Sequence, residues 1–167
     1  MIHLIACIDN NSAIGNKGTL LTKPPLDFKH FKKLTTNNFV VFGRKTYEEI
    51  GKPLPDRQNI VITSNLNHEY HPEVSVYPSV QDVLSDYINY AEKQVDLYIC
   101  GGERVYKEFM EHADYIHLTI VDHSFAESDT FFPRFNLDDW TVESNIKNAA
   151  DEQYPYDYYF VSYKRKY

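Results

Sequence analysis

The chain has 167 residues, of which 43% are hydrophobic and 15% aromatic, and this composition excludes a disordered protein. Its 17 basic and 24 acidic side chains give a formal net charge of −7, which argues against nucleic-acid binding. No apolar run approaches the ~18 residues of a membrane helix, and the N-terminal run meets Asp9 too early for a secretion signal. We therefore expect one domain over residues 1–167, a monomer in the reducing cytoplasm, with no membrane or nucleic-acid partner.

Short apolar, β-branched runs alternate with helical patterns, which indicates an α/β domain with a largely parallel sheet. We expect strands at Ile2–Ile8, Phe39–Phe42, Asn59–Thr63, Val74–Tyr77, Val95–Cys100, Tyr115–Asp122, Thr141–Ile146 and Tyr156–Lys164. We expect helices at Pro25–Thr35, Lys45–Ile50, Val80–Ala91 and Glu103–Glu111. Because no helix separates the last two strands, the sheet should end antiparallel.

The segment from Asp9 to Pro24 shows neither pattern. It is polar and glycine-containing, with a few apolar residues embedded, among them Ile14 and Leu20. A loop of this length in a small domain is usually functional or mobile. It leaves the end of the first strand where open α/β sheets place their ligands, so we expect it to border a ligand site.

Two glycine turns join a buried strand to a helix, at Gly43-Arg44-Lys45-Thr46 and at Gly101-Gly102-Glu103-Arg104. Glycine lets a backbone approach a ligand closely, and the helix that follows offers unpaired N–H groups to an anion. Taken alone, the turn at Gly43 would be read as an ordinary strand–helix turn with solvated cations. Together the two turns suggest a ligand with several phosphates, such as a dinucleotide. Neither matches a Rossmann or Walker motif.

The hydroxyls of Thr63 and Ser64 follow the strand after Arg57. With Arg44 they would hold one further phosphate, which favours NADPH over NADH, and the alternative is an ordinary turn at this point. Cys7 and Cys100 lie in apolar runs without a C-x-x-C spacing, so we expect buried thiols. The histidines show no ligand spacing, and we expect no metal site.

One acidic and one basic side chain, Asp27 and Arg57, indicate a second part of the ligand site. A helical reading places Asp27, Phe31 and Leu34 on one apolar face, where the Asp27 carboxylate either caps the helix or meets a ligand in an apolar pocket with a raised pKa. The turn Pro53-Leu54-Pro55 precedes Arg57 and stiffens the chain there. A guanidinium held in this way suits a carboxylate ligand, and the alternative is a surface side chain or a pair with Asp56.

These residues resemble the dihydrofolate reductase family. The resemblance rests on Ile5-Ala6-Cys7, Ile14-Gly15, Asp27 with Phe31, the run GRKTYEEIGKPLPDRQNIV, ICGGERVY, Thr119 and the run DTFFP at 129–133, all in that family's order from Ile2 to Trp140. It implies a three-layer fold with an eight-stranded, mostly parallel sheet, an antiparallel C-terminal strand and about four flanking helices. It also implies NADPH-dependent reduction of 7,8-dihydrofolate to tetrahydrofolate.

The resemblance further implies a role for each site residue. Asp27 would bind the amino-pyrimidine edge of the pterin and promote protonation of the neighbouring ring nitrogen, Thr119 would hold the same edge, and Arg57 would take the glutamate carboxylate. Phe28, Phe31, Ile50 and Leu54 would line the slot for the substrate rings, and Ile5, Cys7, Cys100 and Tyr106 would border the nicotinamide. Residues Ile14, Gly15 and Leu20 would belong to a mobile loop over the nicotinamide. Gly43, Arg44, Lys45, Thr46, Thr63, Ser64, Gly101, Gly102, Glu103, Arg104 and Val105 would hold the cofactor phosphates, with a cis peptide between the paired glycines.

One position departs from the family pattern. Leu21-Thr22 stands where the family usually has Pro-Trp, and the chain's single tryptophan, Trp140, matches another position. The Thr22 hydroxyl would have to hold the ordered water that the indole N–H normally holds. Two alternatives are a riboflavin-pathway reductase on the same scaffold, which needs neither Asp27 nor Arg57, and a non-catalytic nucleotide-binding protein. Glu103 is expected to point away from the phosphates.

Overall fold

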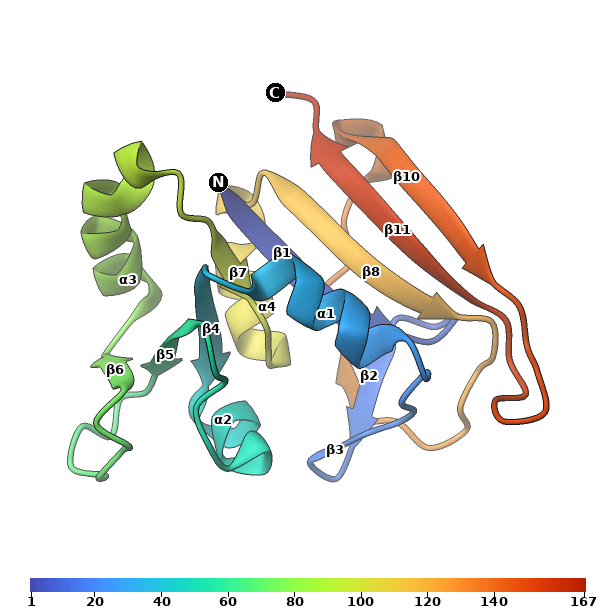
Figure 1. Cartoon of the computed structure of the whole chain (residues 1–167), viewed down its shortest axis with the longest axis horizontal. Coiled ribbons are helices and arrows are strands. Elements are labelled where there is room, and N and C mark those ends of the chain that lie inside the picture. Colours follow the sequence, from blue (N-terminus) through green and yellow to red (C-terminus); the bar gives the residue numbers. More distant parts are fainter.

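The computed structural model describes residues 1–167, apart from the side chain of Ala91. One sheet of eight strands runs through the molecule in the order β10-β11-β8-β1-β7-β4-β5-β6 (Figure 1). These strands are β1 (Ile2–Ile8), β4 (Phe39–Gly43), β5 (Gln58–Ile62), β6 (Val74–Tyr77), β7 (Leu97–Ile99), β8 (Tyr115–Val121), β10 (Trp140–Asn148) and β11 (Tyr158–Arg165). The six from β8 to β6 are parallel, whereas β11 is antiparallel to β8 and β10 to β11, which confirms the predicted fold class.

Four α-helices cover the two faces of the sheet. They are α1 (Asp27–Thr35), α2 (Arg44–Ile50), α3 (Val80–Tyr87) and α4 (Glu103–Phe109). Helices α3 and α4 are each followed by a 3-10 turn, Ile88–Lys93 and Met110–His112, so the two longer helices predicted there end early. None of the described helices has both the length and the apolar character needed to cross a membrane.

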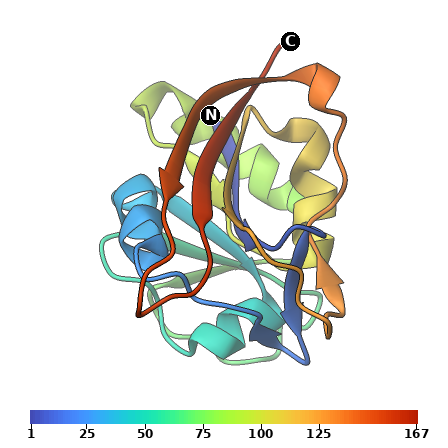
Figure 2. The ribbon, with the colours of Figure 1, turned by 90° about the vertical axis from the view of Figure 1, so that its right-hand side faces the viewer.

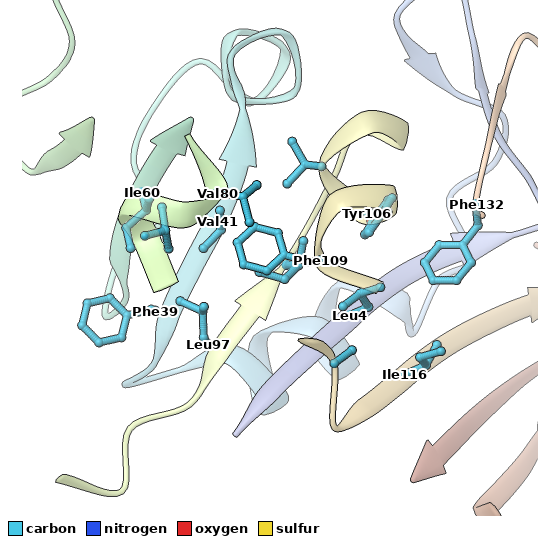
Figure 3. Close-up of a cluster of buried hydrophobic side chains, with 14 of the residues drawn as sticks. Leu4, Phe39, Val41, Ile60, Val80, Leu97, Tyr106, Phe109, Ile116 and Phe132 are labelled. Carbon is cyan, nitrogen blue, oxygen red and sulfur yellow. The ribbon is translucent and has the colours of Figure 1, made fainter. Parts of the chain in front are cut away.

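Each sheet face has its own apolar cluster. Helices α3 and α4 pack Val80 and Phe109 with Leu4 and Leu97 on one face (Figure 3). Helices α1 and α2 lie on the other face, where the Tyr47 ring joins a smaller cluster. In Figure 2, α1 and α4 accordingly lie on opposite sides of the sheet. Strand β4 is buried on both faces, which explains why its sequence is apolar throughout rather than alternating.

The segment from Asp9 to Pro24 was predicted as an irregular loop, and this expectation is wrong in part. It contains β2 (Ala13–Asn16) and β3 (Thr19–Leu20), which form a second small sheet with β9 (Thr130–Phe131). The Asp129 N–H donates to the Gly15 carbonyl, and Asp129 Oδ2 accepts from the Lys17 N–H. The partner strand lies more than a hundred residues along the chain, so local sequence patterns do not reveal the pairing.

Candidate active site

A cavity of about 600 Å³ opens at the C-terminal edge of the parallel strands, between α1, α2 and the β2–β3 hairpin. This is the edge at which the sequence predicted ligand binding. Most of the predicted site residues line it: Ile5, Cys7, Ile14, Gly15, Leu20, Asp27, Phe28, Phe31, Lys45, Thr46, Ile50, Leu54, Arg57, Cys100, Gly101, Gly102, Tyr106 and Thr119. The lining does not include Thr22, Gly43, Arg44, Thr63, Ser64, Glu103, Arg104 or Val105.

The Asp27 carboxyl lies at the first residue of α1. Thr119 Oγ1 donates a hydrogen bond to Asp27 Oδ1 at 2.6 Å. Burial raises the pKa of the Asp27 carboxyl, and the bond from Thr119 opposes the rise. The N-terminus of α1 has no side-chain cap, so the carboxyl serves the cavity rather than the helix end.

Strand pairing sets the neighbours of this acid. Cys7 on β1 lies in register with Thr119 on β8, so both side chains border Asp27. Burial raises the pKa of the Cys7 thiol, and the Asp27 carboxylate raises it further. Both cysteines are free thiols at the cavity wall, where they pack as small apolar groups. Tyr106 is buried, and its hydroxyl donates to the Ile5 carbonyl at 2.7 Å.

Apolar side chains stand exposed at the cavity mouth. Phe28 is 59% exposed, Leu20 40% and Ile50 36%, although a single domain normally buries such groups. They come from α1, β3 and α2, and they face one opening. A gathering of exposed apolar groups around a concave site favours a ligand that has a sizeable apolar part.

The Arg57 guanidinium is held at the far end of this opening. Its Nε donates to the Pro55 carbonyl at 2.7 Å, and one terminal nitrogen donates to Thr35 Oγ1 at 3.3 Å. No carboxylate lies within ion-pair distance of Arg57 among the described side chains, which removes the predicted alternative of a pair with Asp56. The remaining donors of the fork are available to an anionic ligand.

The two glycine turns meet at the other side of the cavity. The Gly43 N–H donates to the Gly101 carbonyl at 2.8 Å, and the Gly101–Gly102 peptide is cis, as the resemblance implies. A Cβ on Gly102 would lie 3.3 Å from Thr46 Oγ1, and one on Gly101 would lie 3.6 Å from the same atom. Side chains at the paired glycines would thus fill the cradle between the turns, and glycine at both positions keeps this space open.

Charged side chains near the turns have partners within their own helices. Arg44 lies 3.3 Å from Glu48, and Arg104 lies 2.6 Å from Glu108. Glu103 Oε1 pairs with Lys107 at 2.9 Å, so this carboxylate is engaged along α4. Thr63 Oγ1 accepts from the Asn65 N–H, as in the ordinary turn considered above, and its hydroxyl proton is still available to a phosphate.

Sequence reasoning missed several residues of the cavity wall, among them His30, Lys32, His117 and Thr130. His117 precedes Thr119 by two residues on β8, so the two side chains point to the same face of the sheet. This two-residue spacing from Thr119 was the one feature of the local sequence that could have predicted His117 at the cavity wall. His30 stacks on Phe160 of β11, with ring centroids 3.9 Å apart, and nothing local in the sequence predicts this contact.

Comparisons with known proteins agree with this geometry. The family model for dihydrofolate reductase matches residues 1–165. A dihydrofolate reductase of Bacillus subtilis is 37% identical over 166 residues, which cover 99% of this chain and 95% of the relative. One from Staphylococcus haemolyticus is 34% identical, with 98% and 95% covered.

A solved structure is also similar. It is a dihydrofolate reductase from Enterococcus faecalis in complex with NADP(H) and RAB-propyl, with a TM-score of 0.89 and 34% sequence identity. The match covers 100% of this chain and 97% of that one. The chain therefore belongs to the dihydrofolate reductase family.

Proposed function

We propose that this chain reduces 7,8-dihydrofolate to 5,6,7,8-tetrahydrofolate with NADPH, and that Asp27 promotes the accompanying protonation. The reductase activity and the cofactor follow from membership of the family. The observation that carries the assignment of Asp27 is its hydrogen bond from Thr119 inside an apolar cavity that also borders the glycine turns.

The substrate would lie between Asp27 and Arg57. Asp27 would accept hydrogen bonds from the amino-pyrimidine edge of the pterin, with Thr119 holding both the carboxyl and that edge. Phe28, Phe31, Ile50 and Leu54 would enclose the rings, and Arg57 would bind the glutamate carboxylate with its free donors. Contact of the bound rings with these apolar walls would exclude water, which would strengthen each polar contact inside.

The cofactor would lie across the glycine turns. Gly43, Arg44, Lys45, Thr46, Gly101, Gly102, Glu103, Arg104 and Val105 would surround its diphosphate, and Thr63 and Ser64 with Arg44 would take the 2′-phosphate. Ile5, Cys7, Ile14, Gly15, Leu20, Cys100 and Tyr106 would border the nicotinamide. When bound, NADPH supplies the hydride for the pterin ring. The chain's own part is to align the two rings and to supply one proton on the Asp27 side.

The two alternatives are not favoured. A riboflavin-pathway reductase needs neither an acid on an apolar face nor a fixed guanidinium, and this chain has both. A non-catalytic nucleotide-binding protein would have no use for the Asp27–Thr119 pair. A steady-state assay separates the three: NADPH absorbance should fall with dihydrofolate, and it should stay constant with the riboflavin precursor and with no second substrate. Constant absorbance with dihydrofolate would refute the proposed activity.

We further propose that the chain acts as one domain and as a monomer in the cytoplasm, without a nucleic-acid partner. Its net charge of −7 disfavours nucleic acid, and its two free thiols suit a reducing compartment. Light scattering after gel filtration tests the monomer directly, since a dimer would have twice the 19.6 kDa mass of the chain.

A further inference from the structure

The hairpin between β10 and β11 reaches the segment that leads into α1. Thr22 Oγ1 and Tyr154 Oη are 2.5 Å apart, and the Leu26 N–H donates to Tyr158 Oη at 3.4 Å. Thr22 and Leu26 both lie shortly before Asp27 in the chain. Figure 2 shows the red loop of the hairpin beside the blue segment that enters α1. The hairpin thus contacts this segment at two points, immediately ahead of the proposed catalytic carboxyl.

The hairpin loop is held in one shape. Asp151 Oδ1 accepts from the N–H groups of Gln153 and Tyr154 at 2.9 Å each, and the Asp151 N–H donates to the Tyr154 carbonyl. The Tyr154 ring packs edge-on against Tyr156 and Tyr158, with centroids 5.6 and 5.5 Å apart. Tyr154 is therefore presented to Thr22 by a fixed turn and two neighbouring rings, and its place does not depend on Thr22 alone.

The relative acidity of the Tyr154 and Thr22 hydroxyls indicates which of them donates the hydrogen bond. A phenol is a stronger acid than an alcohol, so Tyr154 is the better donor and Thr22 Oγ1 the better acceptor. In that arrangement the Thr22 hydroxyl proton is left free for a third group. Burial raises the pKa of Tyr154, so the phenol keeps the proton that it donates.

The segment that carries Thr22 leads directly to the cavity that holds Asp27. Thr22 is followed by Lys23, which lines this cavity, and Asp27 lies four residues after Lys23, at the start of α1. Asp27 Oδ1 is taken by Thr119, and no described side chain donates to Oδ2. The second carboxyl oxygen is thus the one available to a water molecule or to the substrate.

We propose that Tyr154 is a positioning residue for the proton that the reaction takes up. By donating to Thr22 Oγ1, it orients the Thr22 hydroxyl to hold a water molecule on the Asp27 side of the substrate. One proton passes from this water to the pterin ring nitrogen, and bulk water replaces that proton. The two hydroxyls together fill the role left open by the missing tryptophan. This inference rests on the proposed function.

Tyr154→Phe tests the inference, because it removes only the hydroxyl. We expect kcat near neutral pH to fall by about three- to tenfold, the worth of one hydrogen bond, with little change in the KM for dihydrofolate. The loss should shrink at low pH, where solvent supplies protons readily, so the fall of kcat with rising pH should begin at a lower pH. Tyr156→Phe is the matched control: it lies two residues away, its ring packs on His123, and no described group bonds to its hydroxyl.

A second variant guards against misfolding. Thr22→Val removes the same hydrogen bond and also the hydroxyl that would hold the water. Its loss should therefore be at least as large and depend on pH in the same way, and the double variant should lose no more than Thr22→Val alone. A Tyr154→Phe profile equal to that of the wild type, a loss equal at all pH values, or additive losses in the double variant would overturn the positioning role. Absence of turnover in the wild type would instead overturn the proposed function.

Discussion

The Asp27 carboxyl lies where two physical effects oppose each other. The start of a helix favours the charged form, whereas burial favours the neutral form. Burial prevails, because the pKa of Asp27 is raised in spite of the hydrogen bond from Thr119. A raised pKa keeps a larger share of the acid protonated near neutral pH, which suits a group that assists proton uptake.

The first prediction concerns the removal of this acid. Asp27→Asn keeps the size of the side chain and removes its ionisation. We expect turnover at neutral pH to fall by roughly 10²–10⁴-fold, the range for a general acid, and the loss to be smaller at low pH, where the substrate is protonated directly from solvent. Steady-state rates between pH 5 and 9 test this. A rate at neutral pH equal to that of the wild type would contradict the role of Asp27.

The second prediction concerns the Arg57 guanidinium, which Pro55 and Thr35 hold without a carboxylate partner among the described residues. Arg57→Ala should weaken dihydrofolate binding by about 1.5–3 kcal/mol, the range for hydrogen bonds to a charged group. Binding of a pterin without the glutamate should be unaffected, which makes that ligand the internal control. Titration calorimetry with both ligands measures the difference, and equal losses would rule out a carboxylate clamp.

Single residues were predictable where the signal is local. Asp27 on an apolar helix face and Arg57 after a rigid turn can be read from a few neighbouring letters, and the structure places both at the cavity. Tyr154 could not be read in this way. It meets Thr22 across 132 positions of the chain, and a hairpin tyrosine looks the same in sequence whether its hydroxyl faces solvent or a functional segment.

The elements were predictable to a similar degree. The eight strands of the main sheet and the four helices follow from apolar periodicity, with boundaries shifted by a few residues. Strands β2, β3 and β9 were missed because they are two to four residues long, too short to show an alternating pattern. In addition, β9 pairs with β2 from more than a hundred residues away. Helix α3 ends at Tyr87 because the following turn tightens into 3-10 geometry.

The third prediction belongs to two adjacent elements. Strands β4 and β5 pair with Gly43 opposite Ile62, so Arg44 and Thr63 follow neighbouring strand ends. If they hold the 2′-phosphate, the KM for NADPH should be lower than that for NADH by about tenfold or more, as expected for a charge-assisted hydrogen bond. Arg44→Ala should remove most of this difference while leaving the KM for NADH unchanged. Comparable KM values in the wild type would exclude the phosphate site.

At the scale of the whole molecule, a buried chain of polar side chains crosses the sheet. His3 Nδ1 and His117 Nε2 are 2.9 Å apart, and His117 Nδ1 lies 2.8 Å from Ser162 Oγ. Asp96 lies 3.3 Å from the other nitrogen of His3 and also binds the N-terminal amine. Strands β1, β8 and β11 and the chain terminus are thereby joined through two histidines that are 5% and 8% exposed.

The fourth prediction follows from the ionisation of this pair. Burial lowers the pKa of His117 to about 4 from its ordinary 6.5, with His3 and His30 contributing, and burial likewise lowers the pKa of His3. As the pH falls below about 6.5, these histidines therefore bind protons in the unfolded chain while they stay neutral in the folded chain. The contribution of the neutral histidine pair to the free energy of unfolding is fully present above about pH 6.5 and is lost as the pH falls toward 4. For His117 alone the loss amounts to about 3 kcal/mol of the free energy of unfolding.

Urea unfolding at several pH values between 7.5 and 4.5 measures this dependence, and variants separate it from the titration of carboxylates. His117→Phe keeps a flat ring among its aromatic neighbours but cannot be protonated, so its free energy of unfolding should fall less steeply with acid, even if it is lower at pH 7.5. His71→Phe, at an exposed histidine, should keep the wild-type slope. Equal slopes for His117→Phe and the wild type would show that the buried pair does not limit acid stability, because the proton uptake of unfolding would then come from other groups.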